Sequence, residues 1–258
     1  MATEAERQFT LVSIPASNYV AKARWGLKLA KVNFTEEMHA PLFHRLATKS
    51  KGGSSVPLLF CPETKLILTD SDAIMTFCGT KVPSLYPHEH VKDKELYFDN
   101  EFGPHVRRFA YGMIFSTGSV AKHVLLDPLQ GSMESYAAGC MYPLLKAMLI
   151  KFMNVTDGGV ERSWAKIEAF FKEVDETLGD APLGTQYLAG KTFSAADVSF
   201  CAHAGIILVP RENAFLRPYI DIEALPPVFQ ARHRQLVASK AGQFVLYCWK
   251  HHYPSKDE

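Results

Sequence analysis

The chain has 258 residues, 47% hydrophobic and 21% charged, a balance that can bury a real core in one large domain or two modest ones. Its formal net charge of +1 gives no global field to attract nucleic acid, an anionic membrane or a strongly acidic substrate, so we expect none of these as a partner. The five cysteines include no CxxC pair, so they indicate buried reduced thiols, not a zinc site or a redox dithiol.

Strand and helix signals alternate through the first part of the chain. The run FTLVSI at 9–14 and residues 32–39 predict strands, and apolar residues at helical spacing predict a helix over 19–31. A short helix is expected over 42–48. The runs 56–60 and 66–68 predict two strands that form a hairpin, and another helix begins at Asp70 to Asp72. This order predicts a small α/β layer.

The second part of the chain has helical patterns throughout. Residues 95–116, 133–155, 160–178, 194–209 and 228–247 all carry a period of 3.6 residues, and no comparable strand signal occurs. We therefore expect an α/β domain at 1–84, a linker at 85–91 that is rich in Pro and His, and an all-helical domain at 92–258.

Lys146 and Lys151 interrupt the most apolar stretch, which is typical of a core helix and not of a membrane span. Because the polar N-terminal residues lack the features of a secretory signal, we expect a cytoplasmic protein.

Ser17 lies at the predicted turn from the first strand into the first helix. A helix N-terminus favours an anion, and a hydroxyl there can donate a hydrogen bond to a thiolate. Lowering a thiol pKa by two units from about 8.5 takes about 2.7 kcal/mol, which a charge-assisted hydrogen bond and a helix terminus can supply together. The alternative is that Ser17 only caps the helix.

Two further features flank the predicted hairpin. The Val56–Pro57 step follows a loop of Gly and Ser; a cis bond there would turn the main chain of Val56 outward to pair with an extended peptide, and the alternative is an ordinary trans edge proline. Ser71 could bind a carboxylate at the start of a helix and Asp70 could bind an ammonium group, although the two also fit an N-cap pair. Together with Ser17, these features predict a site for a small zwitterionic peptide that carries a thiol.

This combination resembles the glutathione transferase superfamily over nearly the whole chain. Ser17, Val20, Lys22 and Arg24 have the spacing of the serine-type active-site segment of the tau and phi classes. Val56–Pro57 resembles the family's cis-proline step, and residues 68–74 resemble its Glu-Ser motif with Asp70 in place of Glu. Residues 187–198 resemble the signature that precedes the buried helix of the second domain.

The resemblance implies a thioredoxin-like N-terminal domain, an all-α C-terminal domain, a homodimer, and glutathione as co-substrate without a metal. It implies Ser17 as the catalytic residue. The glutathione-binding residues that we expect are Ser17, Lys51, Val56, Pro57, Asp70 and Ser71. Where the family often places Lys, Gln or His before the Val-Pro step, this chain has Ser54 and Ser55. The sequence therefore does not identify the residue that would bind the glycine carboxylate of glutathione. Tyr19 is the nearest rival to Ser17, but it falls in the predicted helix.

The resemblance also points to residues 102–115 for the second substrate. Arg108, Tyr111 and Phe115 fall on one helical face there, and an aromatic wall with one guanidinium suits an apolar electrophile with an anionic or carbonyl group. The alternative is that Tyr111 and Phe115 belong to the core. His123 could also reach the cleft. His203 is expected to be a satisfied core residue, and the pairs His88/His90 and His251/His252 lack a third metal ligand.

The motif at Ser194 and Asp197 has a structural explanation that does not depend on the resemblance. Ser194 and Asp197 have the spacing of a capping box, in which each side chain satisfies the main-chain N–H of the other residue. Its expected role is to fold the helical domain. The function we expect is conjugation, in which Ser17 stabilises a glutathione thiolate that attacks a hydrophobic electrophile. The alternatives are a non-catalytic carrier of glutathione or a hydrophobic ligand, a glutathione-dependent isomerase or peroxidase, and a scaffold with a vestigial site.

Overall fold

The computed structural model describes residues 8–118 and 120–254. Its N-terminal part contains a four-stranded sheet in the order β2-β1-β3-β4. The strands are β1 Phe9–Ser13, β2 Phe34–Met38, β3 Leu58–Cys61 and β4 Leu66–Leu68. β1 pairs with β2 in parallel and with β3 in antiparallel, and β3 pairs with β4 in antiparallel, so the predicted hairpin is confirmed.

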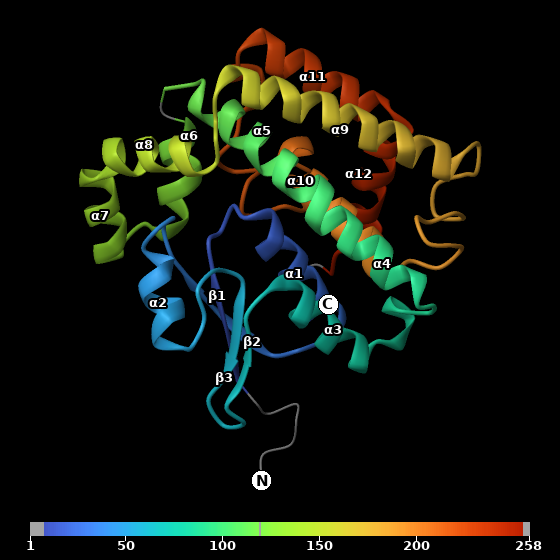
Figure 1. Ribbon diagram of the computed structural model, residues 1–258, viewed down its shortest axis with the longest axis horizontal. Helices are drawn as coiled ribbons and strands as arrows, with labels where there is room; N and C mark the ends of the chain where they lie inside the picture. Colours follow the sequence, from blue (N-terminus) through green and yellow to red (C-terminus); the bar gives the residue numbers. More distant parts are fainter. Residues whose placement is uncertain (1–7, 119, 255–258) are drawn as a thin grey trace.

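Three helices accompany the sheet: α1 Asn18–Leu29, α2 His44–Ser50 and α3 Ser71–Lys81. Residues 20–27 of α1 are all buried, because α1 packs against α3 on the sheet side and against α10 of the helical part. Figure 1 shows α1 between these two layers. A helix that is covered on both sides places its first turn, which carries Ser17 and Asn18, at the junction of the two parts of the molecule.

The rest of the chain is helical. The α-helices are α4 His90–Tyr97, α5 Gly103–Phe115, α6 Val120–Leu126, α7 Met133–Cys140, α8 Tyr142–Phe152, α9 Asp157–Leu178, α10 Ala195–Leu208, α11 Pro227–Ala238 and α12 Lys240–His252. Short 3-10 helices lie at η2 Pro83–Leu85, η4 Asp127–Leu129 and η5 Ile222–Ala224, and η3 Phe98–Phe102 is π-helical. η2 and the start of α4 occupy part of the stretch that was expected to link the domains.

Several predicted helices differ from those in the structure. The predicted helix 95–116 is divided into α4, η3 and α5 by the π-helical turn. The predicted helix 133–155 breaks at Met141, and the predicted helix 228–247 breaks at Ser239. The Ser239 hydroxyl accepts a hydrogen bond from Gly242 N at 3.0 Å and so caps α12. α6 was not predicted, since its seven residues are too few to show a period.

α10 is the centre of the helical part, and every one of its residues is buried. The predicted capping box is present at its start: Ser194 N donates to Asp197 Oδ2 at 2.8 Å, and the Ser194 side chain accepts from the Asp197 main chain. Asp197 Oδ1 also accepts from Leu188 N at 2.8 Å. Gly205 lets α12 approach, because a Cβ there would lie 2.7 Å from Trp249 Nε1.

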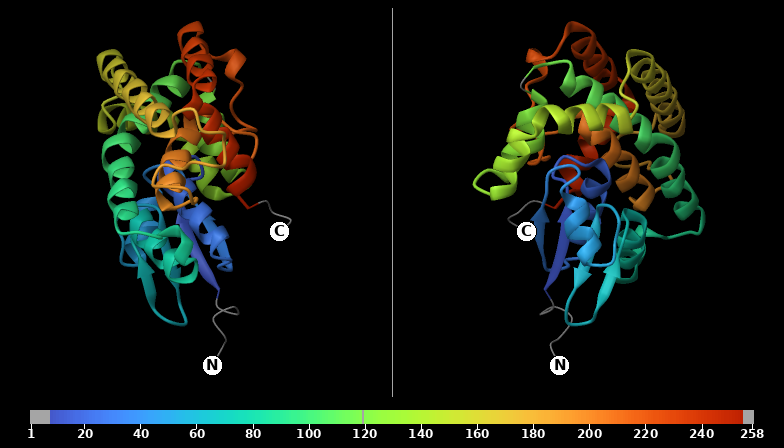
Figure 2. Two further views of the ribbon diagram at one scale, coloured as in Figure 1. Left: turned by 90° about the vertical axis from the view of Figure 1, so that its right-hand side faces the viewer. Right: turned by 60° about the vertical axis from the view of Figure 1, so that its left-hand side comes forward.

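The end of α6 and helices α7 and α8 form a small second core, whereas Val120, Ala121 and Val124 of α6 belong to the main core. Leu125, Leu126, Leu129, Leu145 and Leu149 pack with Ala40 and Ala138, separately from the main core. Glu134 on α7 ties this segment to the N-terminal part: its carboxylate accepts from Ala40 N at 2.6 Å and contacts His39 Nδ1 at 2.7 Å. In Figure 2, α7 and α8 stand apart from the main helical bundle. We call this segment the α6–α8 wall.

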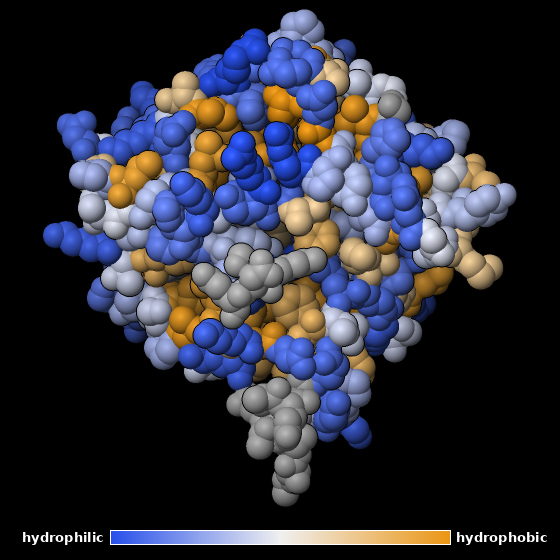
Figure 3. Space-filling model, turned by 180° about the vertical axis from the view of Figure 1, so that it is seen from behind, coloured by the Kyte–Doolittle hydropathy of each residue, from blue (hydrophilic) through white to orange (hydrophobic). Residues whose placement is uncertain are grey.

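The surface mixes both kinds of side chain. Figure 3 shows hydrophilic groups over much of the face opposite to that of Figure 1, with smaller apolar areas between them. Among the described residues, no helix combines the length and the apolar character that crossing a bilayer requires.

Candidate functional site

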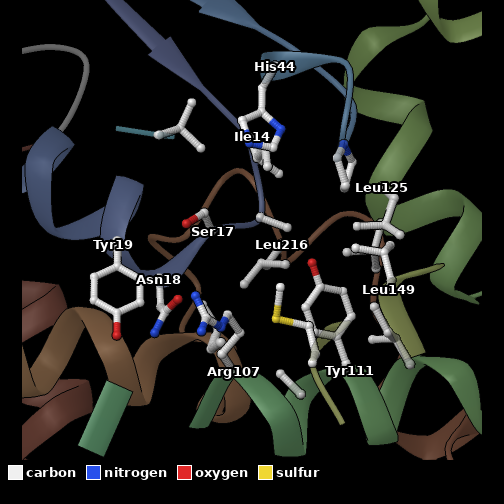
Figure 4. A pocket seen from close by; sticks show the side chains of 18 of the residues that line it. Ile14, Ser17, Asn18, Tyr19, His44, Arg107, Tyr111, Leu125, Leu149 and Leu216 are labelled. Atoms are coloured by element: carbon white, nitrogen blue, oxygen red, sulfur yellow. The ribbon is translucent and has the colours of Figure 1, made fainter. Parts of the chain in front are cut away.

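A cavity of about 230 Å³ lies where the two parts of the molecule meet. Its lining comes from the start of α1, the segment 41–45, the loop at 55–56, one face of α5, the α6–α8 wall and residues 206–220. Figure 4 shows Ser17 between His44 on one side of this cavity and Arg107 on the other, with Tyr111 next to Arg107 and leucines of the wall next to Tyr111. The concave, mostly apolar lining with a few polar groups is typical of a small-molecule site.

Ser17 lies at this cavity as the N-cap of α1. Its hydroxyl oxygen accepts from Val20 N at 3.4 Å, so the capping role that was weighed for it is present. A hydroxyl can accept one hydrogen bond and still donate its own proton. Capping therefore leaves the Ser17 proton available for a ligand, and the two readings of this residue are compatible.

The two basic residues of the same segment have structural partners. Arg24 makes a bidentate contact with Glu36, with Nη2 2.6 Å from Oε1 and Nε 2.9 Å from Oε2, and its Nη1 donates to Pro15 O at 3.0 Å. Arg24 thereby holds the turn that carries Ser17. Lys22 is fully buried and forms ion pairs with Glu95 and Asp99. Neither side chain lines the cavity.

The cis-proline step also reaches the cavity. The bond between Val56 and Pro57 is cis, as the outward-turned arrangement requires. Ser55 and Val56 line the cavity, while Pro57 is buried behind them at the start of β3. The structure thus brings Ser17 and Val56 to one cavity although they are far apart in the sequence.

The other expected glutathione residues have partners within the chain. Asp70 is the N-cap of α3 and accepts from Ala73 N at 2.7 Å, and Ser71 is the buried first residue of that helix. The N-cap pair that was weighed for them is therefore present, and neither residue lines the cavity. Lys51 Nζ lies 2.9 Å from Glu37 Oε2 and also stays outside the lining.

Arg108, the arginine that was expected on the acceptor side, does not line this cavity. Arg108 faces away from the cavity: its Nε donates to Met153 O at 3.0 Å and its Nη1 to Ser163 Oγ at 3.0 Å. Arg107 lines the cavity in its place, on a face that continues through Ala110, Tyr111 and Ile114 at helical spacing. Tyr111 belongs to both faces, which is why the pattern of sequence alone did not separate them.

Tyr111 and Phe115 differ in their surroundings. Tyr111 lines the cavity, whereas Phe115 stacks on it with ring centroids 5.4 Å apart and does not itself reach the lining. His123 is bonded to Asp127, with Nδ1 2.7 Å from Oδ2, and lies outside the lining as well. Tyr111 is therefore the aromatic residue of the predicted set that a ligand in the cavity would touch.

Tyr19, the rival to Ser17, has its proton committed elsewhere. Its hydroxyl donates to the main-chain oxygen of Asp99 at 2.9 Å. Burial raises the pKa of Tyr19 to about 12, against a smaller opposing effect of Arg107. Because the single phenolic proton is already bonded to Asp99 O, it is not available to a thiolate, which favours Ser17 of the two.

Sequence patterns missed two polar groups of the cavity. His44 is about nine-tenths buried, and no hydrogen-bond partner of its Nδ1 lies within the described part of the chain. Burial lowers the pKa of His44, assisted by Arg45, so the ring is neutral near pH 7. Asn18 is the other: its Nδ2 donates to Gly103 O at 3.2 Å, and its buried Oδ1 has no donor among the described residues. No periodicity distinguishes either residue from a core or capping group.

The charges around the cavity have one sign. The described lining includes the cations Arg45 and Arg107 and the neutral His44, and it includes no carboxylate. A chain with a net charge of +1 thus concentrates positive charge at this place. The cavity is suited to a ligand that carries negative charge.

The described residues show no metal-binding site. They contain no group of three His, Cys, Asp or Glu side chains placed to hold an ion. His203 is fully buried and bonded, with Nε2 3.0 Å from Asp99 Oδ1 and Nδ1 2.8 Å from Asn18 Nδ2, which confirms it as a satisfied core residue.

Neither a protein-family model nor a curated protein matches this sequence. Solved structures do. A glutathione transferase of Phanerochaete chrysosporium matches with a TM-score of 0.65 at 17% identity, over 97% of this chain and 99% of its own. One of Ceriporiopsis subvermispora, solved in complex with glutathione, matches at 0.60 and 13% over 97% and 99%. Maize glutathione S-transferase I, solved with an atrazine glutathione conjugate, matches at 0.52 and 15% over 94% and 98%. The chain therefore has the fold of the glutathione transferases, a thioredoxin-like βαβ domain with a mixed four-stranded sheet followed by an all-helical domain.

Proposed function

We propose that this protein is a glutathione transferase in which Ser17 stabilises the glutathione thiolate for attack on a hydrophobic electrophile. One observation carries the proposal. Ser17, Val56 and leucines of the α6–α8 wall line a single cavity. A thiol-bearing peptide that pairs with Val56 would have its sulfur beside Ser17, and the leucines would lie beyond it.

Charge supports an anionic peptide in this position. Glutathione carries two carboxylates and one ammonium group, and ionisation of its thiol adds a further negative charge. We propose that His44 and Arg45 take up a glutathione carboxylate, together with or in place of Lys51, which is paired with Glu37. Asp70 and Ser71 remain the proposed partners of the α-amino acid end, since the exposed Asp70 carboxylate has a second oxygen beyond the one that caps α3.

The chemistry asked of Ser17 is modest. A charge-assisted hydrogen bond contributes about 1.5–3 kcal/mol, and the N-terminus of α1 adds about 0.3–1 kcal/mol. Together these terms are of the size needed to lower a thiol pKa by one to two units, at about 1.4 kcal/mol per unit. The rest of catalysis would be positioning: the cavity holds the sulfur and the electrophile in contact.

Three variants at Ser17 test this proposal. Ser17→Ala removes both the cap and the donor, Ser17→Asp keeps the cap but has no proton to donate, and Ser17→Thr keeps both. We expect kcat/KM for conjugation of glutathione with a general aryl halide to fall about 10- to 100-fold in the Ala variant, the range for one charge-assisted hydrogen bond. The Asp variant should fall further while its melting temperature stays near that of wild type. Conjugation by the Ala variant at the wild-type rate would rule out the role of Ser17.

A second candidate function has its own support. Asp70 is occupied as a cap and Lys51 as the partner of Glu37, so two of the expected glutathione contacts are already satisfied within the chain. That arrangement also fits a carrier that binds glutathione or a hydrophobic ligand without reacting. Retention on immobilised glutathione with no conjugating activity would favour the carrier. Failure to bind glutathione in calorimetry, with the fold intact, would favour a scaffold with a vestigial site.

Assembly and reaction subtype belong to the same proposal. We expect a homodimer, which light scattering would report as twice the chain mass of 28.8 kDa. Isomerisation and peroxide reduction use the same thiolate, so assays with a maleyl substrate and with an organic hydroperoxide should accompany the conjugation assay.

A further inference from the structure

Arg107 has an unusual environment for a cation in this molecule. Its side chain is half-buried at the cavity, and the described residues place neither a carboxylate within ion-pair distance of it nor an acceptor within hydrogen-bond distance. Its nearest recorded contact is the ring of Tyr19, with the guanidinium carbon 5.6 Å from the ring centroid. The adjacent Arg108, by contrast, donates two hydrogen bonds at 3.0 Å. A cation that is partly removed from water without a counter-ion favours the arrival of an anion.

Tyr111 adds a second donor on the same face of α5. It lies one helical turn beyond Arg107, and Figure 4 shows its hydroxyl directed into the cavity. Burial raises the pKa of Tyr111, with Arg107 opposing, so the phenol stays protonated near pH 7. A guanidinium fork and a phenolic proton on one face match the two oxygens of a planar carboxylate.

The surroundings of this pair are apolar. Leu125 and Leu149 from the α6–α8 wall lie beside Tyr111, and Leu216 lies across from them. A ligand at this end would therefore need an apolar body with one negatively charged end.

Glutathione itself is an unsuitable occupant for Arg107. In Figure 4, Ser17 lies between His44 on one side of the cavity and Arg107 on the other. A tripeptide that runs from Ser17 past Val56 toward His44 and Arg45 leaves Arg107 on the opposite side of its sulfur. Arg107 therefore faces the molecule that the sulfur attacks.

We infer that the acceptor half of the cavity selects electrophiles that carry a carboxylate on an apolar body, with Arg107 binding the carboxylate and Tyr111 donating to it. This inference rests on the proposed function, because it names the class of the second substrate. An α,β-unsaturated aryl ketone with a ring carboxylate is a suitable member of the class. The thiolate sulfur bonds to the β-carbon, the double-bond electron pair moves to give an enolate, and the α-carbon takes a proton from water. The net change is addition of the thiol across the double bond, without a redox step.

The test compares an acid with its uncharged ester. The probes are 4-acryloylbenzoate and methyl 4-acryloylbenzoate, with each enzymatic rate corrected for the reaction in buffer. The quantity is the ratio of kcat/KM for acid to ester, measured for wild type, Arg107→Met, Arg107→Lys and the control Lys122→Met, which removes an exposed cation from α6. We expect Arg107→Met to lower the ratio about 10- to 100-fold, since one charge-assisted interaction is lost. Arg107→Lys should lower it less, and Lys122→Met should leave it unchanged.

Two results would overturn the inference. One is a wild-type ratio near unity that Arg107→Met does not change. The other is an equal loss for acid and ester in Arg107→Met, accompanied by a weaker ultraviolet absorbance of the bound thiolate, which would place Arg107 on the sulfur instead of on the substrate.

A binding experiment separates this inference from the proposed function. The saturated compounds 4-propanoylbenzoate and its methyl ester cannot react, so calorimetry reports their affinity even if the protein conjugates nothing. Tighter binding of the acid in wild type, lost in Arg107→Met and kept in Ser17→Ala, supports the carboxylate site whatever the outcome for Ser17. Equal affinities for acid and ester in wild type would refute it.

Discussion

Two positions about one turn apart near the start of α1 face polar environments of opposite character. One turn into the helix, Lys22 is fully buried and forms ion pairs with Glu95 and Asp99. At the start of the helix, the cavity beside Ser17 contains cationic groups and, among its described lining residues, no carboxylate. The first environment is complete within the chain, whereas the second lacks a partner. The difference distinguishes polar groups that are satisfied within the fold from polar groups that are left without a partner in the described chain.

The buried ion pairs of Lys22 belong to a network that joins the two parts of the molecule through Asp99. Its carboxylate contacts Lys22 and accepts from Ser199 Oγ at 2.7 Å and from His203 Nε2 at 3.0 Å. Burial opposes the charge on Asp99, but His203 and Lys22 prevail and hold its pKa well below the usual range. Burial likewise opposes the charge on Lys22, and Glu95 and Asp99 raise its pKa above the ordinary value. Since Asn18 donates to its Nδ1, neutral His203 carries its proton on Nε2 and donates it to Asp99.

The largest expected effect comes from breaking this network. Asp99→Ala leaves Lys22 with half of its counter-charge and His203 without an acceptor, and we expect the free energy of unfolding to fall by about 3–5 kcal/mol. Urea denaturation measures it. Asp99→Asn should cost less, because the volume and one acceptor remain, and Asp93→Ala, at an exposed site on α4, should change stability by less than about 0.5 kcal/mol. An Asp99→Ala protein as stable as wild type would show that the network contributes nothing to folding.

The neighbouring arginines of α5 sharpen the comparison within one helix. Arg108→Met removes two hydrogen bonds, to Met153 O and Ser163 Oγ, and we expect it to cost about 1–3 kcal/mol of stability. Arg107→Met removes no hydrogen bond to described residues and should cost less than about 0.5 kcal/mol. Thermal and urea denaturation of the two variants measure the two losses of stability. Equal losses would mean that Arg107 is a structural residue and not part of an open site.

A third effect, which depends on pH, concerns a buried carboxylate with no cation beside it among the described residues. In the described part of the chain the donors to Asp197 are neutral, among them Leu188 N and Ser194 N, and burial raises the pKa of Asp197 to about 6. The unfolded chain loses this proton near pH 3.8 and the folded protein holds it to about pH 6. Stability from this group is therefore present below about pH 4 and is lost as the pH rises through about 6. Asp99 behaves oppositely, since its contribution is lost as the pH falls below its ordinary range.

The pH effect is measured as a difference between proteins. We expect the stability of wild type relative to Asp197→Asn to decrease as the pH rises from 4 to 7, in urea titrations at fixed ionic strength. A difference that is constant across this range would mean that Asp197 is ionised in the folded protein throughout.

The sequence predicted those features whose signal is local. The order of strands and helices, the hairpin of β3 and β4, and the capping box of Ser194 and Asp197 each depend on residues close together in the chain. The breaks at Met141 and Ser239 were missed, because the apolar period continues across both. Ser239 could have been recognised as an N-cap; Met141 carries no such signal.

The candidate site could be predicted only in part. Ser17 and Val56 were found because turns next to Ser and Pro are visible in the sequence. Arg107 was not, because choosing it over Arg108 requires the rotation of α5, which the π-helical turn before it and packing against α9 determine. The partners of Lys22 and Arg24 lie on other elements, so the spacing of these two residues could not reveal that they support the site structurally.

The separate core of the α6–α8 wall has a consequence for how the binding preference can change. Leu125 and Leu149 line the cavity, yet they pack in a cluster distinct from the one that holds the sheet and α10 together. Glu134 fastens this unit to Ala40 and His39 at its far end. Substitutions at Leu125 and Leu149 can therefore reshape the cavity while the main core keeps its packing, so the shape of the cavity can evolve or be engineered with little effect on the scaffold.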